Sequence, residues 1–469
     1  MLDFLRPPEK LEQLIIESYG GVKFSSWIAD SSFKNLLSLE LRNCKNCKSL
    51  PSVGRLPLLK DLSIIGFDQV QKIGVELFGG NQLNPFVSLE ILSFESLSNW
   101  KEWDTCEGDE KVLKLPSLRE LLIKTCPQLL GRLPTHLPSL QKLEIDRCRS
   151  LVVSISSFSS LCKFSIHRCA ELVDDYSSPA KELSSLQTLS LSDISKFNIP
   201  ADRAMLRFGK SEHFEIDGLK ELESLSQHGF SLVGHHFIFI CRCPLLQSLE
   251  AEEAELQPDK ISLVESLMIG FCGRLNRLPQ VLHELTFLTM IEIHNCRSLV
   301  SFAENNLPPN LKKLRISSCV NLECLVNEKE DNKKGGLLTT SFRDFSVDGC
   351  GNFGALPKCM ASITSLRCLS VRDCSVDISF SSEDFPANLT SLAISNAPKI
   401  YRSLVEWGLN RLTSLQVLHI KGGGCSKVVS FPEEGIGMML PPSLTRIFLS
   451  GFENLEFMFS EGFQDLAFL

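Results

Sequence analysis

The sequence predicts an α/β solenoid made of tandem repeats, and two observations lead to this prediction. The chain has 469 residues, well beyond the roughly 250–300 at which a single globular core stops growing, so it must form several domains or one extended array. In addition, one pattern of aliphatic residues recurs about every two dozen residues. Because no convincing linker interrupts the pattern, we expect residues 1–469 to form a single repeat domain.

The repeat is Leu-x-x-Leu-x-Leu/Ile-x-x-Cys, which is clearest at Leu36, Leu39, Leu41 and Cys44. Two weak copies begin at Ser211 and His235. The remaining copies, some with another residue in the cysteine position, begin at Leu11, Leu59, Leu89, Leu118, Leu140, Leu161, Leu186, Val264, Leu288, Leu311, Phe342, Leu366, Leu389, Leu415 and Leu444. The chain thus holds about eighteen repeats, about 21 to 31 residues apart, which is close to the period of leucine-rich repeats.

The alternating part of each repeat predicts a short strand with one buried face, since successive side chains in a strand point to opposite sides. One such unit cannot bury its apolar face alone, but stacked units share a parallel sheet and a core. We therefore expect a leucine-rich-repeat solenoid, or horseshoe, with one long parallel β-sheet on its concave face. The return segments are rich in Ser, Pro and Gly and often open with a Leu-Pro pair, as at Leu278-Pro279. They predict a convex side of loops and short 3₁₀ turns.

The composition narrows the class of protein. With 43% hydrophobic and 22% charged residues, wholesale disorder is excluded, and a net charge of −8 gives no electrostatic reason for a nucleic-acid or anionic-membrane partner. The most apolar run, Phe237–Leu246, contains an arginine and is too short to cross a bilayer. The amino terminus lacks the apolar stretch of a secretory signal. We expect a cytoplasmic protein without a membrane span.

Catalytic and metal-binding signatures do not stand out. Ten of the eighteen cysteines take the ninth position of a repeat, generally a full repeat apart rather than at the short spacing of a zinc site. We interpret them as small buried side chains that bond to the turn backbone. In the densest group, His235, His236, Cys241 and Cys243, the side chains should diverge to opposite faces. No phosphate loop, nucleophile elbow or zinc-protease motif occurs. We expect neither an enzyme nor a cofactor.

Residues that point outward from the strands are the candidate partner-binding surface. Five apolar residues are predicted outward on three successive repeats, and apolar surface patches tend to mark partner sites. A register shift of one residue at His235 would instead place the phenylalanines in the core. A basic group follows on later repeats, for which an ordinary solvated face is an equally good interpretation. The predicted contact residues are Phe237, Phe239, Met268, Phe271, Met290, Lys312, Lys313, Arg315, Arg343, Arg367 and Arg372.

Two further charged groups are predicted on outward positions nearer the amino terminus. One is basic and the other is acidic, and we interpret both as solvated strand faces or as partner sites with equal weight. They comprise Lys142, Arg147, Lys163, His167 and Arg168, and Glu212, Glu215 and Asp217.

Several segments resemble a known family. The stretches Leu11–Trp27, Leu36–Pro51, Leu59–Ile64 and Phe94–Trp103 look like repeats of the plant intracellular nucleotide-binding leucine-rich-repeat immune receptors of the coiled-coil class. The likeness runs through nearly the whole chain, and the first hundred or so residues are its most specific part.

The resemblance implies a function. Receptors of this family carry a coiled-coil domain and a nucleotide-binding switch domain before the repeats, and residues 1–469 contain neither. By resemblance, the repeats would recognise a pathogen effector or a guarded host protein, and would restrain the nucleotide-binding domain of the same receptor until then. The alternative is the substrate-recognition repeat domain of a ubiquitin-ligase subunit, although no F-box-like segment precedes Leu11. An extracellular receptor ectodomain would need a signal peptide and flanking cysteine caps, which the sequence lacks.

Longer repeats and the ends of the chain carry three more expectations. Insertions at Trp103–Lys114 and Glu328–Gly336 should bulge into solvent. Met1 opens almost directly into a repeat, and the apolar stretch Phe463–Leu469 ends the chain. Because terminal repeats normally need polar caps, we expect truncation at both ends.

Overall fold

The structure is a computed structural model that divides into two compact units. Unit 1 comprises residues 1–220 and 228–231, and unit 2 comprises 221–227 and 232–469. The structure describes residues 2–80, 85–104, 115–134, 137–155, 158–174, 182–249, 262–303, 307–326, 341–356, 360, 363–375, 377–380, 385–425, 427–433 and 438–458. Each unit is described by itself, so the expected single domain of about eighteen repeats stays a prediction.

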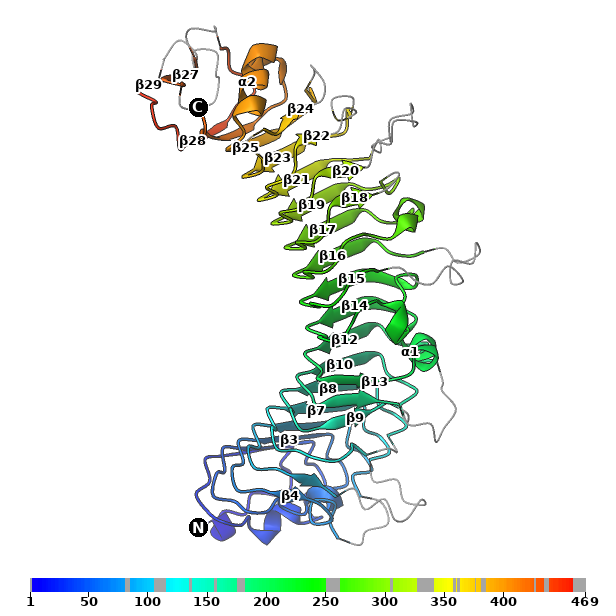
Figure 1. Cartoon of the computed structure of the whole chain (residues 1–469). Helices are drawn as coiled ribbons and strands as arrows, with labels where there is room; N and C mark the ends of the chain where they lie inside the picture. Colours follow the sequence, from blue (N-terminus) through cyan, green and yellow to red (C-terminus); the bar gives the residue numbers. More distant parts are fainter. Residues whose placement is uncertain are drawn as a thin grey trace. The chain divides into compact units, whose positions relative to one another are not determined.

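Unit 1 is a ladder of parallel strands, each paired with the next one along the repeats. Figure 1 shows these strands side by side, one from each repeat. They are β1 (Gln13–Glu17), β2 (Ser38–Arg42), β3 (Asp61–Ile65), β5 (Ile91–Glu95), β7 (Glu120–Lys124), β8 (Lys142–Asp146), β10 (Lys163–His167), β12 (Thr188–Ser192) and β14 (Ser211–Asp217). The predicted parallel solenoid is therefore confirmed in this unit.

Unit 2 repeats the same construction with an unbroken register. Its strands are β15 (His235–Cys241), β16 (Ser266–Gly270), β17 (Met290–His294), β19 (Lys313–Ser317), β21 (Asp344–Asp348), β23 (Cys368–Arg372), β25 (Ser391–Ser395), β26 (Val417–Lys421) and β28 (Arg446–Ser450). Every strand opens at or near the position that the repeat pattern predicts.

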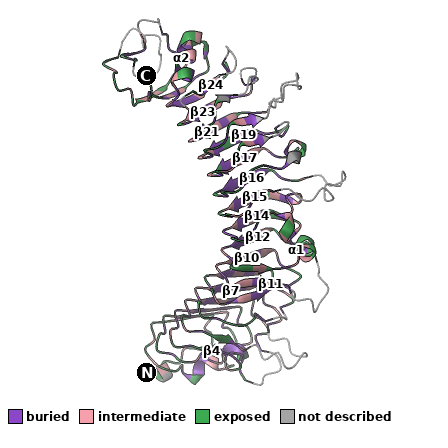
Figure 2. Cartoon of the chain, in the orientation of Figure 1, coloured by how far each residue is buried: buried purple, intermediate pink, exposed green. Residues whose placement is uncertain are grey.

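The core of each unit is the inward row of aliphatic side chains. On β16, Leu267 and Ile269 are buried, and they pair in register with Ile291 and Ile293 on β17. Figure 2 shows this alternation as buried segments that recur along each strand ladder. Full burial of one such side chain contributes about 1.5–3 kcal/mol. Only neighbouring repeats can supply that burial, which is why the pattern must recur to fold.

The return segments contain more order than the sequence predicts. Short 3₁₀ turns occur as expected, at η1 (Leu2–Phe4), η2 (Ser26–Ala29), η3 (Val53–Arg55), η4 (Ser226–His228), η6 (Gln280–Glu284) and η8 (Leu409–Arg411). Beside them lie short parallel strands that the irregular spacing of these segments did not reveal. These are β4 (Lys72–Ile73), β6 (Glu102–Trp103), β9 (Val152–Ser154), β11 (Glu171–Val173), β13 (Lys196–Asn198), β18 (Ser301–Ala303), β20 (Cys324–Val326), β22 (Ala355–Leu356), β24 (Ser379–Phe380), β27 (Ser430–Phe431) and β29 (Phe457–Met458).

Within the described parts of the return segments there are two α-helices, α1 (Ala201–Phe208) in unit 1 and α2 (Pro398–Trp407) in unit 2. Of the expected insertions, residues 105–114 and 328–336 lie outside the described residues, as does the apolar stretch 463–469.

The ninth position of the repeat stabilises the turn that follows each strand. The thiol of Cys44 donates to the carbonyl of Arg42 at 3.3 Å, and that of Cys272 donates to the carbonyl of Gly270 at 3.3 Å. Burial raises the pKa of the Cys374 thiol to about 12, so this group stays protonated and able to donate. The predicted bond from the cysteine to the turn backbone is therefore confirmed.

Helix α1 is fixed to unit 1 by a buried ion pair. Asp174 is fully buried and accepts from Arg203 at 2.7 Å and from Arg207 at 3.0 Å, and Arg207 is itself buried. Burial raises the pKa of the Asp174 carboxyl, but the hydrogen bond from Arg203 and the charge of Arg207 outweigh it and lower the pKa below its ordinary value.

We expect Leu288→Asp to unfold the repeats around β17. Leu288 is fully buried, and the substitution places an unpaired charge in the core, at a cost of more than about 4 kcal/mol. Circular dichroism melts of the whole chain measure the loss, with the exposed neighbour substitution Thr286→Asp as the control. An unchanged melt for Leu288→Asp would show that the assigned register is wrong here.

The Asp174 pair makes unit 1 sensitive to acid. A carboxyl whose pKa is lowered by folding stabilises the fold above its unfolded pKa of about 3.9, and this stability is lost as the pH falls through the folded value. The free energy of unfolding should therefore drop below about pH 4, and Asp174→Asn should remove part of this drop. At pH 7 that variant should lose about 3–5 kcal/mol, because Arg207 stays buried without its partner.

Urea titrations at several pH values measure both effects by tryptophan fluorescence, since Trp27, Trp100 and Trp103 all lie in unit 1. Asp202→Asn, on the exposed side of α1, is the control. Equal acid sensitivity in the Asp174 variant and the parent chain would contradict the assignment.

Candidate protein-recognition surface

The outward positions of unit 2 form continuous rows because the register between its strands is unbroken. One row runs Phe239, Met268, Glu292 and Arg315 across β15, β16, β17 and β19. Two residues further along the same strands, a second row runs Cys241, Gly270, His294 and Ser317. Side chains from repeats that are far apart in sequence therefore lie about 4.8 Å apart, the spacing of neighbouring strands.

The register of β15 decides whether its phenylalanines face the core. Ile238 and Ile240 are buried, whereas Phe237 is 38% exposed and Phe239 is half-buried. The phenylalanines thus point outward, and the alternative of a one-residue shift is wrong. His235 and Cys243 are buried in the same repeat, while His236 and Cys241 are half-buried on the strand, so the four side chains diverge as expected.

A pocket of about 330 Å³ opens between these two rows. Phe239, Met268 and Phe271 supply its apolar wall, and Arg315 stands at its rim. His294 packs edge-on against Phe271, with ring centroids 5.1 Å apart. The structure therefore brings four of the predicted contact residues together around one pocket. The sequence did not predict this pocket.

Sequence reasoning missed the rest of the lining. Cys241, Gly270, Glu292, His294 and Ser317 also line the pocket. The signal that could have found it is Gly270, because a glycine inside a strand often marks a place where a ligand approaches closely.

Ion pairs organise the charges beside the pocket. Glu292 accepts from Lys313 at 2.8 Å and lies 3.6 Å from Arg315. Arg315 also contacts Asp344 at 3.2 Å, and its side chain is 50% exposed. Lys313 and Arg315 are thus largely neutralised by two acids, and such exposed pairs contribute about 0–1 kcal/mol each to stability.

A second set of cations precedes the strands. Lys312, Arg343 and Arg367 occupy equivalent positions in three successive repeats, linked by backbone hydrogen bonds from Arg343 N to Lys312 O and from Arg367 N to Arg343 O. All three are exposed. Arg367 donates to the carbonyls of Thr364 and Leu366, whereas Lys312 and Arg343 make no ion pair with any residue that the structure describes.

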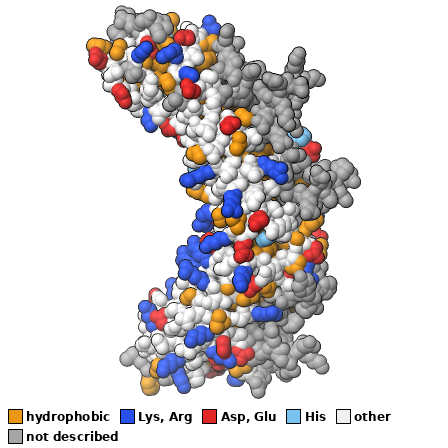
Figure 3. All heavy atoms as spheres, viewed as in Figure 1, with side chains coloured by type: hydrophobic (Ala, Val, Ile, Leu, Met, Phe, Trp, Pro, Cys, Tyr) orange, Lys and Arg blue, Asp and Glu red, His pale blue; other side chains and the backbone are white. Residues whose placement is uncertain are grey.

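The remaining predicted residues lie away from the pocket. Phe237 is the third residue of β15 and Met290 the first of β17; both point outward, level with each other across β16, and neither lines the pocket. Arg372 is half-buried at the end of β23, where its Nε has no hydrogen-bond partner in the structure. Figure 3 shows Lys and Arg side chains beside hydrophobic ones over the described surface of unit 2.

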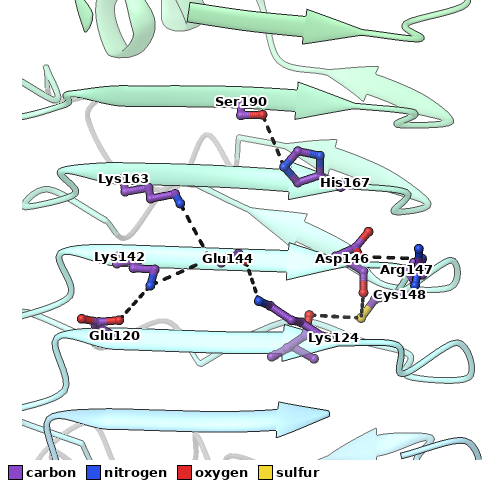
Figure 4. A network of polar contacts seen from close by, with 11 residues as sticks. Glu120, Lys124, Lys142, Glu144, Asp146, Arg147, Cys148, Lys163, His167 and Ser190 are labelled. Atoms are coloured by element: carbon purple, nitrogen blue, oxygen red, sulfur yellow. Dashed lines mark hydrogen bonds and ion pairs between the residues drawn. The ribbon is translucent and has the colours of Figure 1, made fainter. Parts of the chain in front are cut away.

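The strand face of unit 1 presents a different arrangement, which Figure 4 shows. Glu144 is surrounded by Lys124 at 2.7 Å, Lys163 at 3.8 Å and Lys142 at 3.9 Å. Burial raises the pKa of Glu144, but the hydrogen bond and charge of Lys124, with the charges of the other lysines, lower it overall. Lys142 also contacts Glu120. All three lysines therefore form ion pairs with glutamates of this face.

A serine, a histidine and an acid also meet on this face. Ser190 Oγ donates to Glu215 at 2.7 Å and lies 3.3 Å from His167 Nε2. In a nucleophilic triad the acid orients the histidine and leaves the serine proton to it. Here the serine hydroxyl donates its hydrogen bond to Glu215, and the acid does not contact His167, so the order of contacts differs from that of a triad.

The strand ladder, the buried ninth position and the turn chemistry define the chain as a leucine-rich-repeat protein. In agreement, residues 1–67 match the family model described as R13L1/DRL21 LRRs. No helix among the residues that the structure describes has the length and apolarity to cross a membrane.

Curated relatives extend the comparison along the chain. A putative disease resistance protein of Arabidopsis thaliana is 27% identical over 99% of this chain and 43% of its own length. The putative disease resistance RPP13-like protein 1 of the same plant is 32% identical over 63% of the chain and 24% of its length. In Solanum bulbocastanum, the putative disease resistance protein RGA1 is 31% identical over 42% of the chain and 19% of its length. The chain thus matches less than half the length of each relative.

These similarities support a leucine-rich-repeat region like those of plant disease resistance proteins. The coiled-coil class stays a prediction.

Solved structures give weaker likenesses. The complex of TLR13 with ssRNA13 has a TM-score of 0.38 at 15% identity, covering 93% of this chain and 70% of that one. The circular leucine-rich-repeat protein CroV588 has a TM-score of 0.35 at 14% identity, covering 98% and 71%. At such low TM-scores neither likeness supports a conclusion about this chain.

Replacing Phe239 and Met268 with Ser should leave the fold almost unchanged, because both side chains point outward. We expect a change of less than about 1 kcal/mol in the free energy of unfolding. The matched control is Ile238→Ser, one residue away on the buried face, which should cost about 2–5 kcal/mol. Thermal and urea melts measure both, and a large loss for the outward pair would assign those residues to the core.

Proposed function

We propose that this chain is the protein-recognition sensor region of a plant innate immune receptor, and that the outward strand face of unit 2 binds a pathogen effector or a guarded host protein. The observation that carries the proposal is the apolar pocket at Met268, which Arg315 of β19 also lines, together with the exposed cations Lys312 and Arg343 before β19 and β21. An anchoring pocket with a polar rim is the arrangement that concentrates binding energy in protein interfaces. The disease resistance proteins among the relatives support the immune role.

The proposal extends to a partner within the same receptor. The relatives are longer than this chain, and by the family resemblance a nucleotide-binding switch domain would contact the repeats in cis. Recognition can release that domain only if the ligand binds the restrained and released states with different affinity. The receptor would act in the cytoplasm, it would belong to the coiled-coil class, and the repeats themselves would recognise rather than catalyse.

The test is a binding screen of pathogen effectors and host proteins against the whole chain, expressed in plant leaves, followed by measurement of Kd for each purified partner. At least one partner should bind with Kd in the micromolar range or tighter. The double substitution Lys312→Glu and Arg343→Glu should raise that Kd at least about tenfold, because it reverses two charges that form no ion pair with a described residue.

The matched control is Lys45→Glu with Lys48→Glu, two exposed lysines of unit 1 away from this face. Partners that respond equally to both pairs of substitutions, or to neither, would contradict the assigned surface. Stable co-purification with a ubiquitin-ligase adaptor in place of an effector or guarded protein would favour the alternative function.

A further inference from the structure

We propose that the pocket at Gly270 takes one large apolar side chain from its protein ligand, and that acidic residues about six and seven positions away in the ligand contact Lys312 and Arg343. The inference rests on the proposed function and adds the chemistry of the recognised segment.

The hollow exists because one outward position carries no side chain. Gly270 lies between Cys241 and His294 in the second row of outward positions. A Cβ at Gly270 would lie 3.4 Å from Cys241 Sγ and 3.8 Å from His294 Cβ, which is ordinary van der Waals contact. The backbone there is regular strand, so the glycine is not needed for conformation. Because Gly270 has no side chain, it leaves space for the pocket.

Strained backbone holds the aromatic wall of the hollow. Phe271 has φ of +53°, the left-handed conformation that recurs at the same turn position of other repeats, where residues such as Asn43, Thr125 and Arg242 stand. Asn tolerates this conformation, whereas an aromatic residue is uncommon there and costs of order 1–3 kcal/mol. Although strained, Phe271 is 48% exposed to solvent instead of being buried in compensation.

The wall chemistry selects an apolar occupant. Phe239 comes from one repeat and Met268 and Phe271 from the next, and all three line the pocket together with the glycine. A pocket of about 330 Å³ lies at the small end of the range for ligand sites, which suits a single side chain. Methionine adapts its shape to the group it contacts. A Trp, Leu, Phe or Met side chain of the ligand fits these walls.

The exposed cations of unit 2 determine which ligand residues accompany the apolar side chain. Glu292 and Asp344 are taken up by Lys313 and Arg315, and Asp348 lies at the far end of β21. Lys312 and Arg343 are exposed, so their charges attract an acidic partner. Gly270 is level with Ser317, which lies two strand spacings away, about 10 Å. Lys312 precedes Ser317 by five residues, about 16 Å along the strand, so it lies about 19 Å from Gly270. An extended ligand covers this distance in about six residues, and one strand spacing more reaches Arg343.

Two labelled peptides test the inference on the whole chain by fluorescence anisotropy. One carries the order Trp-Gly-Ser-Gly-Ser-Gly-Glu-Glu and the other the reverse, so that both chain directions are tested. One of them should bind saturably with Kd below about 1 mM. Replacing its Trp with Ala, or making Gly270→Val in the protein, should weaken binding at least about tenfold. The first change removes the side chain that enters the pocket, and the second fills the space it would occupy.

Ser370→Val is the matched control, because it adds the same side chain at an outward position of β23 away from the pocket. Phe271→Asn is a second test variant: it should keep or raise thermal stability by relieving the backbone while weakening the peptide, so a folding defect in Gly270→Val would not mask the result. Unchanged affinity in folded Gly270→Val or Phe271→Asn, or no saturable binding of either peptide, would overturn the inference.

The substitutions Lys312→Glu and Arg343→Glu separate this inference from the proposed function. They should weaken the Glu-containing peptide and leave its Gln counterpart unaffected. If they weaken a folded partner while Gly270→Val does not, the pocket assignment fails and recognition by this face stands. If a folded partner ignores both sets of variants, the proposed surface fails as well.

Discussion

The structure depends on the register that the buried aliphatic row imposes between neighbouring parallel strands. Leu267 and Ile269 on β16 are buried between equivalent residues of β15 and β17, so neither strand can slide without exposing its own apolar side chains. In a strand, a slip of one residue moves the entire buried set to the opposite face. The inward row thereby fixes the outward rows, and the positions of Met268 and Arg315 follow from residues that they do not contact.

This coupling explains how much the sequence could predict. The strands, their parallel order and their buried positions all follow from a pattern with period two that recurs in each repeat. The weak repeat at His235 was ambiguous because Phe237, Ile238, Phe239 and Ile240 are all apolar, so no polar residue marks the solvent side. Its neighbours settle the register, since Ile238 and Ile240 pair with the buried Leu267 and Ile269.

The pocket could not be predicted in the same way. It arises from a missing side chain at Gly270, a left-handed turn at Phe271 and the side-chain packing of His294, which involve two neighbouring repeats and a turn. No local pattern encodes such a combination. The short strands of the return segments also escaped prediction, because their lengths and spacing vary from repeat to repeat and give no periodic signal.

The two basic groups looked alike in the sequence, and only the structure separates them. Lys124, Lys142 and Lys163 surround Glu144 in unit 1. The negative charge of Glu144 therefore neutralises part of their positive charge. In unit 2, Lys312 and Arg343 face solvent.

The strict alternation of buried and outward residues also bears on how such a protein can change over generations. Of five residues in a strand such as Met290–His294, two are committed to the core and three face outward. Inherited substitutions at the outward three alter what the surface offers while the fold is retained. Across many strands this gives natural selection a wide set of nearly independent positions, so new specificities can arise by small steps in an unchanged scaffold.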